Sequence, residues 1–308
     1  MNDDAVIVEV GLNESVSPTV QPNVAQSPSA CAADALRCAD AGAAIVHWHA
    51  VDTLGQQRLA DSELYGAALD LIDGRILAYP SYPTDVADVV SERLAHCLAL
   101  RERNGLEIAP IDVASVNLVL FDGRSGIAPV APTPGLDVIR NSLPFVLDAL
   151  RQYRSVGLVP TLAAFDLGST RTIAALAAAG LLDSPILLKI FLWGSPCIGP
   201  EPSVEALELH LRQLPAGLDV EWILVPYGIA QPDRIEALAR AALERGGGIR
   251  IGIGDNPTAY PQDSNAQLVA LAETWATEVG RPLATSDDVR HRFATFNDQP
   301  NAHDARSG

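Results

Sequence analysis

The chain has 308 residues, of which 48% are hydrophobic, a length and composition that suit a large buried core. Its 21 basic and 38 acidic side chains give a formal net charge of -17, which argues against nucleic acid or an anionic membrane surface as a partner. The amino terminus lacks the basic and hydrophobic regions of a secretion signal, and the cysteines lack the spacing of a disulfide framework or a thiolate metal site. These features predict a cytoplasmic protein.

Apolar segments alternate with amphipathic ones along almost the whole chain. The apolar segments predict strands at 5–12, 43–49, 75–80, 112–118, 157–164, 185–192, 221–226 and 249–254. The segments that follow them predict helices at 29–41, 61–73, 85–103, 136–154, 168–180, 202–213, 232–245 and 264–279. Eight strand-helix units indicate an α/β protein with a single (β/α)8 TIM barrel. We expect the barrel to be one catalytic domain over residues 1–293, followed by a polar, disordered tail at 294–308.

The active site of such a barrel lies at the carboxyl ends of its strands. Polar residues at those positions are therefore the candidates for substrate binding, metal binding and catalysis. They are Asn13 and Glu14 after the first strand, His47 and His49 at the end of the second, Ser81 after the third, Ser115 and Asn117 at the fourth, and Asp255 after the eighth.

The two histidines of the second strand are the most informative of these residues. Because side chains alternate along a strand, His47 and His49 point to the same side. Such a pair can hold one divalent metal, with a third protein ligand and one open position. The alternative is two half-buried histidines that bond to backbone or carboxylate groups. We expect the histidines within helices, such as His96 and His210, at the surface.

The glycine-rich segment 246–256 is the second dense motif. Gly252 and Gly254 lie on the predicted strand, where they leave room for a ligand or another backbone to approach. Arg250 and Asp255 are candidates for an anion clamp and a general base. The pattern alone favours the alternative, in which they form a structural ion pair.

Lys189 is the only lysine in the chain, and it lies inside an apolar strand. An isolated buried ammonium is very unfavourable, so this lysine must be deprotonated or paired. One interpretation is a Schiff-base nucleophile with a lowered pKa. The other, which we favour, is a buried pair with Glu9 of the first strand, because two opposite charges in barrel strands explain each other.

Three segments together resemble the β-keto acid cleavage enzymes, a family that includes the 3-keto-5-aminohexanoate cleavage enzyme. They are AGAAIVHWHA, GGGIRIGIGDN and SNAQLVALAETWATEVGRPLAT, and the resemblance extends over about residues 5–293. It implies a (β/α)8 barrel that binds a divalent metal, usually Zn²⁺. It also implies that a β-keto acid and acetyl-CoA are converted to acetoacetate and a new acyl-CoA, and that the protein is a homo-oligomer, either a dimer or a tetramer.

The resemblance also implies roles for individual residues. His47 and His49 match the two metal-binding histidines of the family. Arg250 and Asp255 match the arginine and aspartate of its Arg-x-Gly-x-Glu-Asp-Asn motif, in which the arginine orients the aspartate as the general base. The positions that contact the keto acid in the family are here Ser81, Ser115 and Asn117. The polar residue that ends the first strand is here Asn13.

This chain departs from the family pattern at the third metal ligand. The family has a glutamate before the aspartate, where this chain has Gly254. We expect Glu14 to take its place, ahead of Glu9 or Asp255, because the loop after the first strand opens toward the same end of the barrel. A further departure is Thr161, where a carboxylate is expected.

Two other functions stay open at this level. One is a class I aldolase that uses Lys189 as its Schiff-base nucleophile. The other is a barrel that has lost activity together with the glutamate and only binds a ligand.

Overall fold

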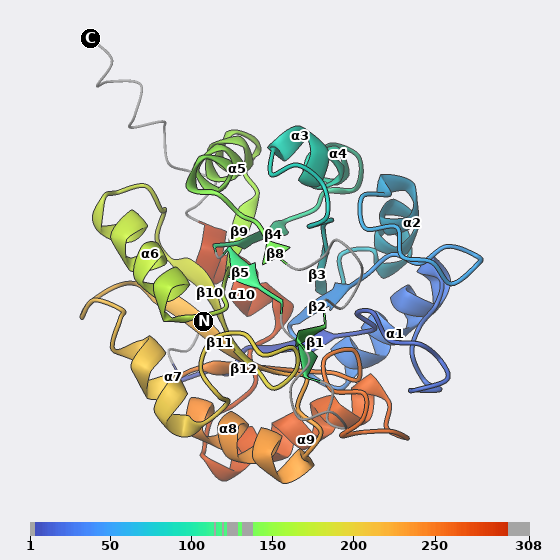
Figure 1. Cartoon of the computed structure of the whole chain (residues 1–308). Coiled ribbons are helices and arrows are strands. Elements are labelled where there is room, and N and C mark those ends of the chain that lie inside the picture. Colours follow the sequence, from blue (N-terminus) through green and yellow to red (C-terminus); the bar gives the residue numbers. More distant parts are fainter. Residues whose placement is uncertain (1–3, 114, 119, 122–128, 131–137, 295–308) are drawn as a thin grey trace.

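The computed structural model describes residues 4–113, 115–118, 120–121, 129–130 and 138–294, and it confirms the predicted barrel (Figure 1). The tail expected to be disordered lies, from residue 295 on, outside the described residues. Within the described residues, the barrel strands are β1 Val8–Gly11, β2 Ile45–Trp48, β3 Leu77–Pro80, β4 Ile108–Asp112, β9 Val159–Ala164, β10 Ile186–Trp193, β11 Val220–Tyr227 and β12 Gly248–Ile251. They are parallel and lie in the order β3-β2-β1-β12-β11-β10-β9-β4. Contacts between β3 and β4 bring the two ends of this order together.

Helices surround the strands on the outside (Figure 1). They are α1 Pro28–Asp40, α2 Ser62–Ile72, α3 Val90–Arg93, α4 Ala95–Asn104, α5 Leu143–Val156, α6 Leu167–Ala178, α7 Val204–Leu211, α8 Pro232–Glu244, α9 Asn265–Glu278 and α10 Ser286–Phe293. Among the described helices, none is long and apolar enough to cross a membrane.

The strand predicted at 112–118 is wrong in position, because β4 ends at Asp112. The sequence of β4 contains Pro110. Proline has no backbone N–H group to donate to a neighbouring strand, so its presence argues against a strand. Proline is tolerated at the edge of a sheet, and β4 is one end of the hydrogen-bonded order. Ser115 and Asn117 therefore lie beyond the barrel strand.

The segment between β4 and α5 forms short antiparallel pairs. They are β5 Val116–Asn117 with β8 Val138–Ile139, and β6 Leu120–Phe121 with β7 Pro129–Val130. The helix predicted at 136–154 therefore begins later, after Ser142, whose side chain accepts a hydrogen bond from the backbone N–H of Phe145 as an N-cap. The helix predicted at 85–103 is divided at Leu94 into α3 and α4.

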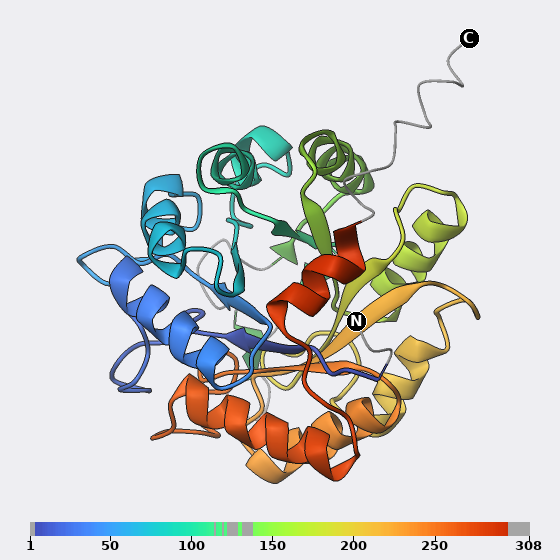
Figure 2. The same ribbon diagram turned by 180° about the vertical axis from the view of Figure 1, so that it is seen from behind.

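The helix α10 was not predicted, and it lies across the amino-terminal end of the barrel (Figure 2). Val289 and Phe293 of α10 pack against the apolar side chains at the beginning of the strands. Ser286 fixes the start of the helix, because its hydroxyl donates to the carbonyl of Ala44 at 2.7 Å and accepts from the N–H of Leu77 at 3.3 Å. The sequence SDDVRHRF has two large apolar residues, too few for a clear helical period.

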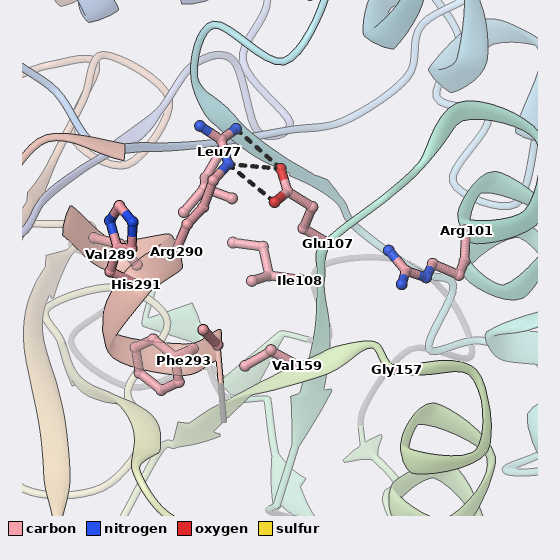
Figure 3. Close-up of a pocket in the computed structure, with 11 residues that line it drawn as sticks. Leu77, Arg101, Glu107, Ile108, Gly157, Val159, Val289, Arg290, His291 and Phe293 are labelled. Atoms are coloured by element: carbon pink, nitrogen blue, oxygen red, sulfur yellow. Dashed lines mark hydrogen bonds and ion pairs between the residues drawn. The ribbon is translucent and has the colours of Figure 1, made fainter. Parts of the chain in front are cut away.

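A cavity of about 280 Å³ lies between α10 and the amino-terminal ends of β3, β4 and β9 (Figure 3). Ile108, Val159 and Phe293 line it, and Arg290 pairs with Glu107 at 2.9 Å at its edge. The described residues around it include none of the predicted site residues. This cavity is therefore separate from the end of the barrel where chemistry is expected.

The inward-pointing side chains form three layers along the barrel axis. Nearest α10 is an apolar layer of Ile45, Leu77, Ile108, Val159, Leu187 and Ile223. Next is a buried polar layer of Glu9, His47, Tyr79, Thr161, Lys189 and Arg250. At the carboxyl ends of β9, β10 and β11 is an aromatic layer of Phe165, Phe191, Trp193 and Tyr227. The polar layer supplies reactive groups directly beneath the mouth of the barrel.

The chain approaches β1 closely just after β12, and this close approach can be tested by a substitution at Gly252. A Cβ atom at this position would clash with the carbonyl oxygen of Gly11. We expect Gly252→Ala to lower the free energy of unfolding by about 3 kcal/mol or more, because only backbone movement can relieve this clash. The control is Gly168→Ala in α6, where a Cβ makes an ordinary 3.4 Å contact. Equal stability of both variants in denaturant titrations would contradict the packing described.

Candidate active site

Glu14, His47 and His49 converge at the carboxyl ends of β1 and β2. One carboxylate oxygen of Glu14 lies 3.3 Å from Nε2 of His47, and the other lies 2.9 Å from Nε2 of His49. All three residues are buried, and their potential ligand atoms lie within 4.8 Å of one another. Two imidazoles and one carboxylate form a donor set used by catalytic zinc sites, so this group fits a divalent metal.

The electrostatics of the site favour the metal-binding protonation states of Glu14 and His47. Burial works to raise the pKa of Glu14, but its interactions with His49 and Arg250 hold it well below its usual value. Burial also lowers the pKa of His47 well below its usual value. A carboxylate and a neutral imidazole are the forms that coordinate metals.

Asn13 holds the backbone that carries this group. Its side-chain oxygen accepts a hydrogen bond from the N–H of His49 at 2.8 Å. Its amide nitrogen donates to the carbonyls of His49 at 2.9 Å and Ala25 at 3.0 Å. The side chain is fully buried, so the structure places Asn13 where it positions His49 and the Glu14 loop.

Arg250 is the centre of a buried ion network. Its Nε and Nη2 donate to the two oxygens of Asp255 at 3.0 and 2.7 Å, and its Nη1 donates to Glu9 at 3.1 Å. Its Nη2 also contacts Glu14. Gly11 makes the network possible, because a Cβ there would lie 2.7 Å from Nη2 of Arg250.

Asp255 has the pKa expected of a proton acceptor near neutral pH. Burial raises its pKa to about 6, against the opposing effect of Arg250. Its two oxygens are directed at Arg250, and the described residues that line the cavity include Arg250 but not Asp255.

Gly254 leaves no room for the family glutamate. A Cβ at this position would lie 2.8 Å from the backbone N of Asn13 and from the carbonyl of Gly11. A larger side chain would therefore require movement of β1. The carboxylate in this part of the site comes from Glu14, whose φ of 41° turns the backbone after β1 into the left-handed region.

Lys189 and Glu9 are connected through Tyr79. Nζ of Lys189 donates to the Tyr79 hydroxyl at 2.5 Å, and that hydroxyl donates to Glu9. No direct Lys189–Glu9 ion pair occurs among the described residues, so the pair favoured from the sequence is wrong in detail. Burial lowers the pKa of Lys189. The sequence could not reveal that the Tyr79 hydroxyl lies between Lys189 and Glu9, since the position of Tyr79 depends on the register of β2 and β3.

A cavity of about 260 Å³ opens above these groups, slightly smaller than the range of roughly 300–1,000 Å³ that is typical of ligand sites. Glu14, His47 and His49 lie on one side. On the other side are the four rings that we call the aromatic wall: Phe165, Phe191, Trp193 and Tyr227. In the strand order β10 is four strands away from β2, so these two sides face each other across the barrel.

The structure brings some of the other predicted residues to this cavity. Ser81 lines it, as do Lys189 and Arg250. Ser115 and Asn117 are exposed, and the hydroxyl of Ser115 instead accepts a hydrogen bond from the N–H of Asn141 at 2.9 Å. The residues that β4 contributes to the cavity are Pro110 and Asp112, and burial raises the pKa of Asp112.

Sequence analysis missed Asp112 as a cavity residue because it ends β4, and Pro110 argues against a strand at that place. The expectation that His96 and His210 are at the surface is also wrong. Both are buried, and burial lowers the pKa of each to about 4.

Comparisons with known proteins agree with the fold and with the family resemblance seen in the sequence. A family model described as beta-keto acid cleavage enzyme matches residues 5–294. The 3-dehydrocarnitine:acetyl-CoA trimethylamine transferase of Rhizobium meliloti (strain 1021) is 25% identical over 314 residues, covering 92% of this chain and 93% of the relative.

Similar solved structures include those of ObcA. Apo ObcA has a TM-score of 0.67 and 17% identity, over 89% of this chain and 66% of the ObcA chain. This chain therefore spans about two thirds of that protein. The ternary complex of ObcA with a C4-CoA adduct and oxalate has a TM-score of 0.61 and 17% identity, over 89% of this chain and 68% of the other.

The Tyr79 bridge can be tested by removing one hydroxyl. We expect Tyr79→Phe to lower the free energy of unfolding by about 1–3 kcal/mol, because Lys189 and Glu9 each lose a buried partner. The control is Tyr260→Phe, since the buried Tyr260 hydroxyl has no hydrogen-bond partner among the described residues. Denaturant titration of both variants measures the difference. A loss no larger than the control would show that the bridge does not stabilise the fold.

Proposed function

The chain belongs to the family of β-keto acid cleavage enzymes, and we propose that it converts a β-keto acid and acetyl-CoA into acetoacetate and a new acyl-CoA. The observation that carries this proposal is the convergence of Glu14, His47 and His49 at one cavity, beside Arg250, whose guanidinium binds Asp255 beneath it. The name of the Rhizobium meliloti relative supports acetyl-CoA as the second substrate.

We propose Zn²⁺ as the metal, held by Glu14, His47 and His49. When bound, the ion would supply Lewis-acid polarisation of the keto and carboxylate oxygens of the substrate. Arg250 fixes the Glu14 carboxylate, and Asn13 fixes the His49 backbone. These contacts would hold the donor set in place before the substrate arrives.

In the proposed mechanism a base removes a proton from C2 of the β-keto acid. The resulting carbon nucleophile attacks the thioester carbonyl of acetyl-CoA, and the CoA thiolate leaves. The thiolate then adds to the original C3 carbonyl, and the C2–C3 bond breaks. The products are the new acyl-CoA and, after the carbon regains a proton, acetoacetate.

We propose Asp255 as the base, because its pKa of about 6 suits proton transfer near neutral pH. Arg250 holds the Asp255 carboxylate in one orientation with two hydrogen bonds. The substrate must therefore reach Asp255 through a rearrangement around Arg250. Asp112 is the competing base, since it lines the cavity directly and its pKa is also raised.

A pair of aspartate variants tests the assignment of the base. We expect Asp255→Asn to lower kcat by about 100-fold or more while metal content is unchanged.

A third variant tests the metal site. We expect His47→Ala to lose the metal, measured by elemental analysis of untagged protein, because one of three ligands is removed.

The matched control for Asp255→Asn is Asp112→Asn, which should retain most of the turnover. The opposite pattern, with activity lost in Asp112→Asn and retained in Asp255→Asn, would move the base to Asp112. Wild-type protein that binds no Zn²⁺ after reconstitution would contradict the metal-dependent mechanism.

A class I aldolase is the second candidate, because Lys189 lines the cavity and its pKa is lowered by burial. The metal-dependent proposal predicts that borohydride treatment with a β-keto acid leaves Lys189 unmodified. Mass spectrometry is unambiguous here, since the chain has one lysine. A reduced adduct on Lys189 would favour the aldolase. Binding without turnover or adduct would favour a barrel that only binds.

A further inference from the structure

The cavity between α10 and the amino-terminal ends of β3, β4 and β9, which we call the amino-terminal cavity, takes no part in the proposed reaction. The proposed metal ligands lie at the other end of the barrel, where β1 and β2 end. Among the described residues, the linings of the two cavities share no member. A ligand of the amino-terminal cavity would therefore occupy a site of its own.

The floor of the amino-terminal cavity is apolar. It consists of side chains from the apolar layer and from α10, namely Leu77, Ile108, Val159, Val289 and Phe293, all of which are buried. Figure 3 shows Ile108, Val159 and Phe293 around one space. These side chains offer water no hydrogen-bond partner, so an apolar chain is favoured over water on this floor.

The edge of the cavity carries four titratable side chains: Arg101, Glu107, Arg290 and His291. His291 is exposed to solvent. Nε and Nη2 of Arg290 donate to the Glu107 carboxylate at 2.9 to 3.0 Å, so these two charges neutralise each other (Figure 3). Nη1 of Arg290 donates to Asp287 at 2.8 Å. The donors of Arg290 and the carboxylate of Glu107 are therefore already used within the chain.

Arg101, in the last turn of α4, keeps its positive charge, because no carboxylate of the described residues pairs with it. Its Nε donates to the carbonyl of Val156 at 3.0 Å, and its Nη1 donates to the carbonyl of Leu106 at 3.1 Å. These bonds fix the guanidinium and leave Nη2 without a partner in the part of the chain that the structure describes. Figure 3 shows the guanidinium directed toward Ile108. An uncompensated cation with free N–H donors therefore lies beside the apolar floor.

We propose that the amino-terminal cavity binds a small monocarboxylate with a short apolar chain, its carboxylate on Arg101 and its chain on the apolar floor. A carboxylate matches the planar guanidinium and accepts charge-assisted hydrogen bonds from it. One unpaired guanidinium balances one negative charge, so a monoanion fits better than a dianion such as a phosphate ester. The volume of about 280 Å³ is slightly below the range of roughly 300–1,000 Å³ that is typical of ligand sites, so the chain must be short.

Three probes of equal chain length test the preferred charge: hexanoate, 1-hexanol and hexylammonium. In calorimetric titrations of the wild-type protein, hexanoate should bind with a dissociation constant on the order of 1 mM or lower. It should bind about tenfold more tightly than 1-hexanol, which cannot accept charge-assisted hydrogen bonds. Hexylammonium should bind more weakly still, because Arg101 repels it. No binding of hexanoate, or equal affinities for hexanoate and 1-hexanol, would overturn the inference.

Substitutions on α4 test the role of Arg101. We expect Arg101→Gln to weaken hexanoate binding about tenfold, to the level of 1-hexanol, and Arg101→Lys to retain more of the affinity because it keeps the charge. The matched control is Arg103→Gln on the same helix, since Arg103 pairs with the exposed Glu63 and does not line the cavity. Its affinity for hexanoate should equal that of the wild type. Unchanged affinity in Arg101→Gln would overturn the inference, and if this variant fails to fold, Arg101→Lys and the three probes still decide.

Carboxylates also bind zinc, so a further variant locates the bound hexanoate. His47→Ala removes a proposed metal ligand at the opposite end of the barrel and should leave the affinity for hexanoate unchanged. Loss of hexanoate binding in His47→Ala would place the ligand at the proposed metal site and overturn the inference. The inference does not rest on the proposed function, because the titrations measure binding without acetyl-CoA or turnover.

Discussion

The site depends on one buried guanidinium. Arg250 is held between carboxylates from β1, the loop after β1 and the loop after β12, and its exposed fraction is 2%. Removing one member of such a network leaves an uncompensated buried charge, which typically costs about 3–5 kcal/mol. The network therefore fixes the loops relative to each other. Glu14 is oriented toward the two histidines because the other side of its carboxylate is bound to Arg250.

Close backbone approach is the second condition for this arrangement. Gly11, Gly252 and Gly254 lie where β1 meets β12, and a Cβ at any of them would contact backbone or network atoms too closely. The same packing explains why a carboxylate cannot come from position 254. Position 254, beyond the end of β12, carries no side chain, and the loop after β1 supplies the carboxylate from Glu14 instead. The loop after β1 then completes the donor set, and β1 and β12 keep their close packing.

The sequence predicted the parts of the structure that follow from local periodicity. Alternating apolar segments were enough for the barrel, and the loop position of Glu14 was enough to place it near His47 and His49. The position of β4, and with it that of Asp112, was not predicted because Pro110 argues against a strand. A strand at the edge of a sheet tolerates proline, whereas a central strand does not. The Tyr79 bridge was hidden for another reason. It depends on a cross-strand register, His47 opposite Tyr79, which no single segment encodes.

The two sides of the cavity at the carboxyl ends of the strands differ in the residues that form them and in the interactions that hold them. The groups proposed to act on the keto acid come from β1, β2 and β12, and they are locked by ionic and amide hydrogen bonds. The aromatic wall comes from β9, β10 and β11 and is held mainly by ring packing. The two sides meet where the guanidinium carbon of Arg250 lies 5.9 Å from the ring centroid of Phe191. The two sides of the cavity therefore come from different strands and are held by different interactions, so a barrel of this kind can change one side while it keeps the other.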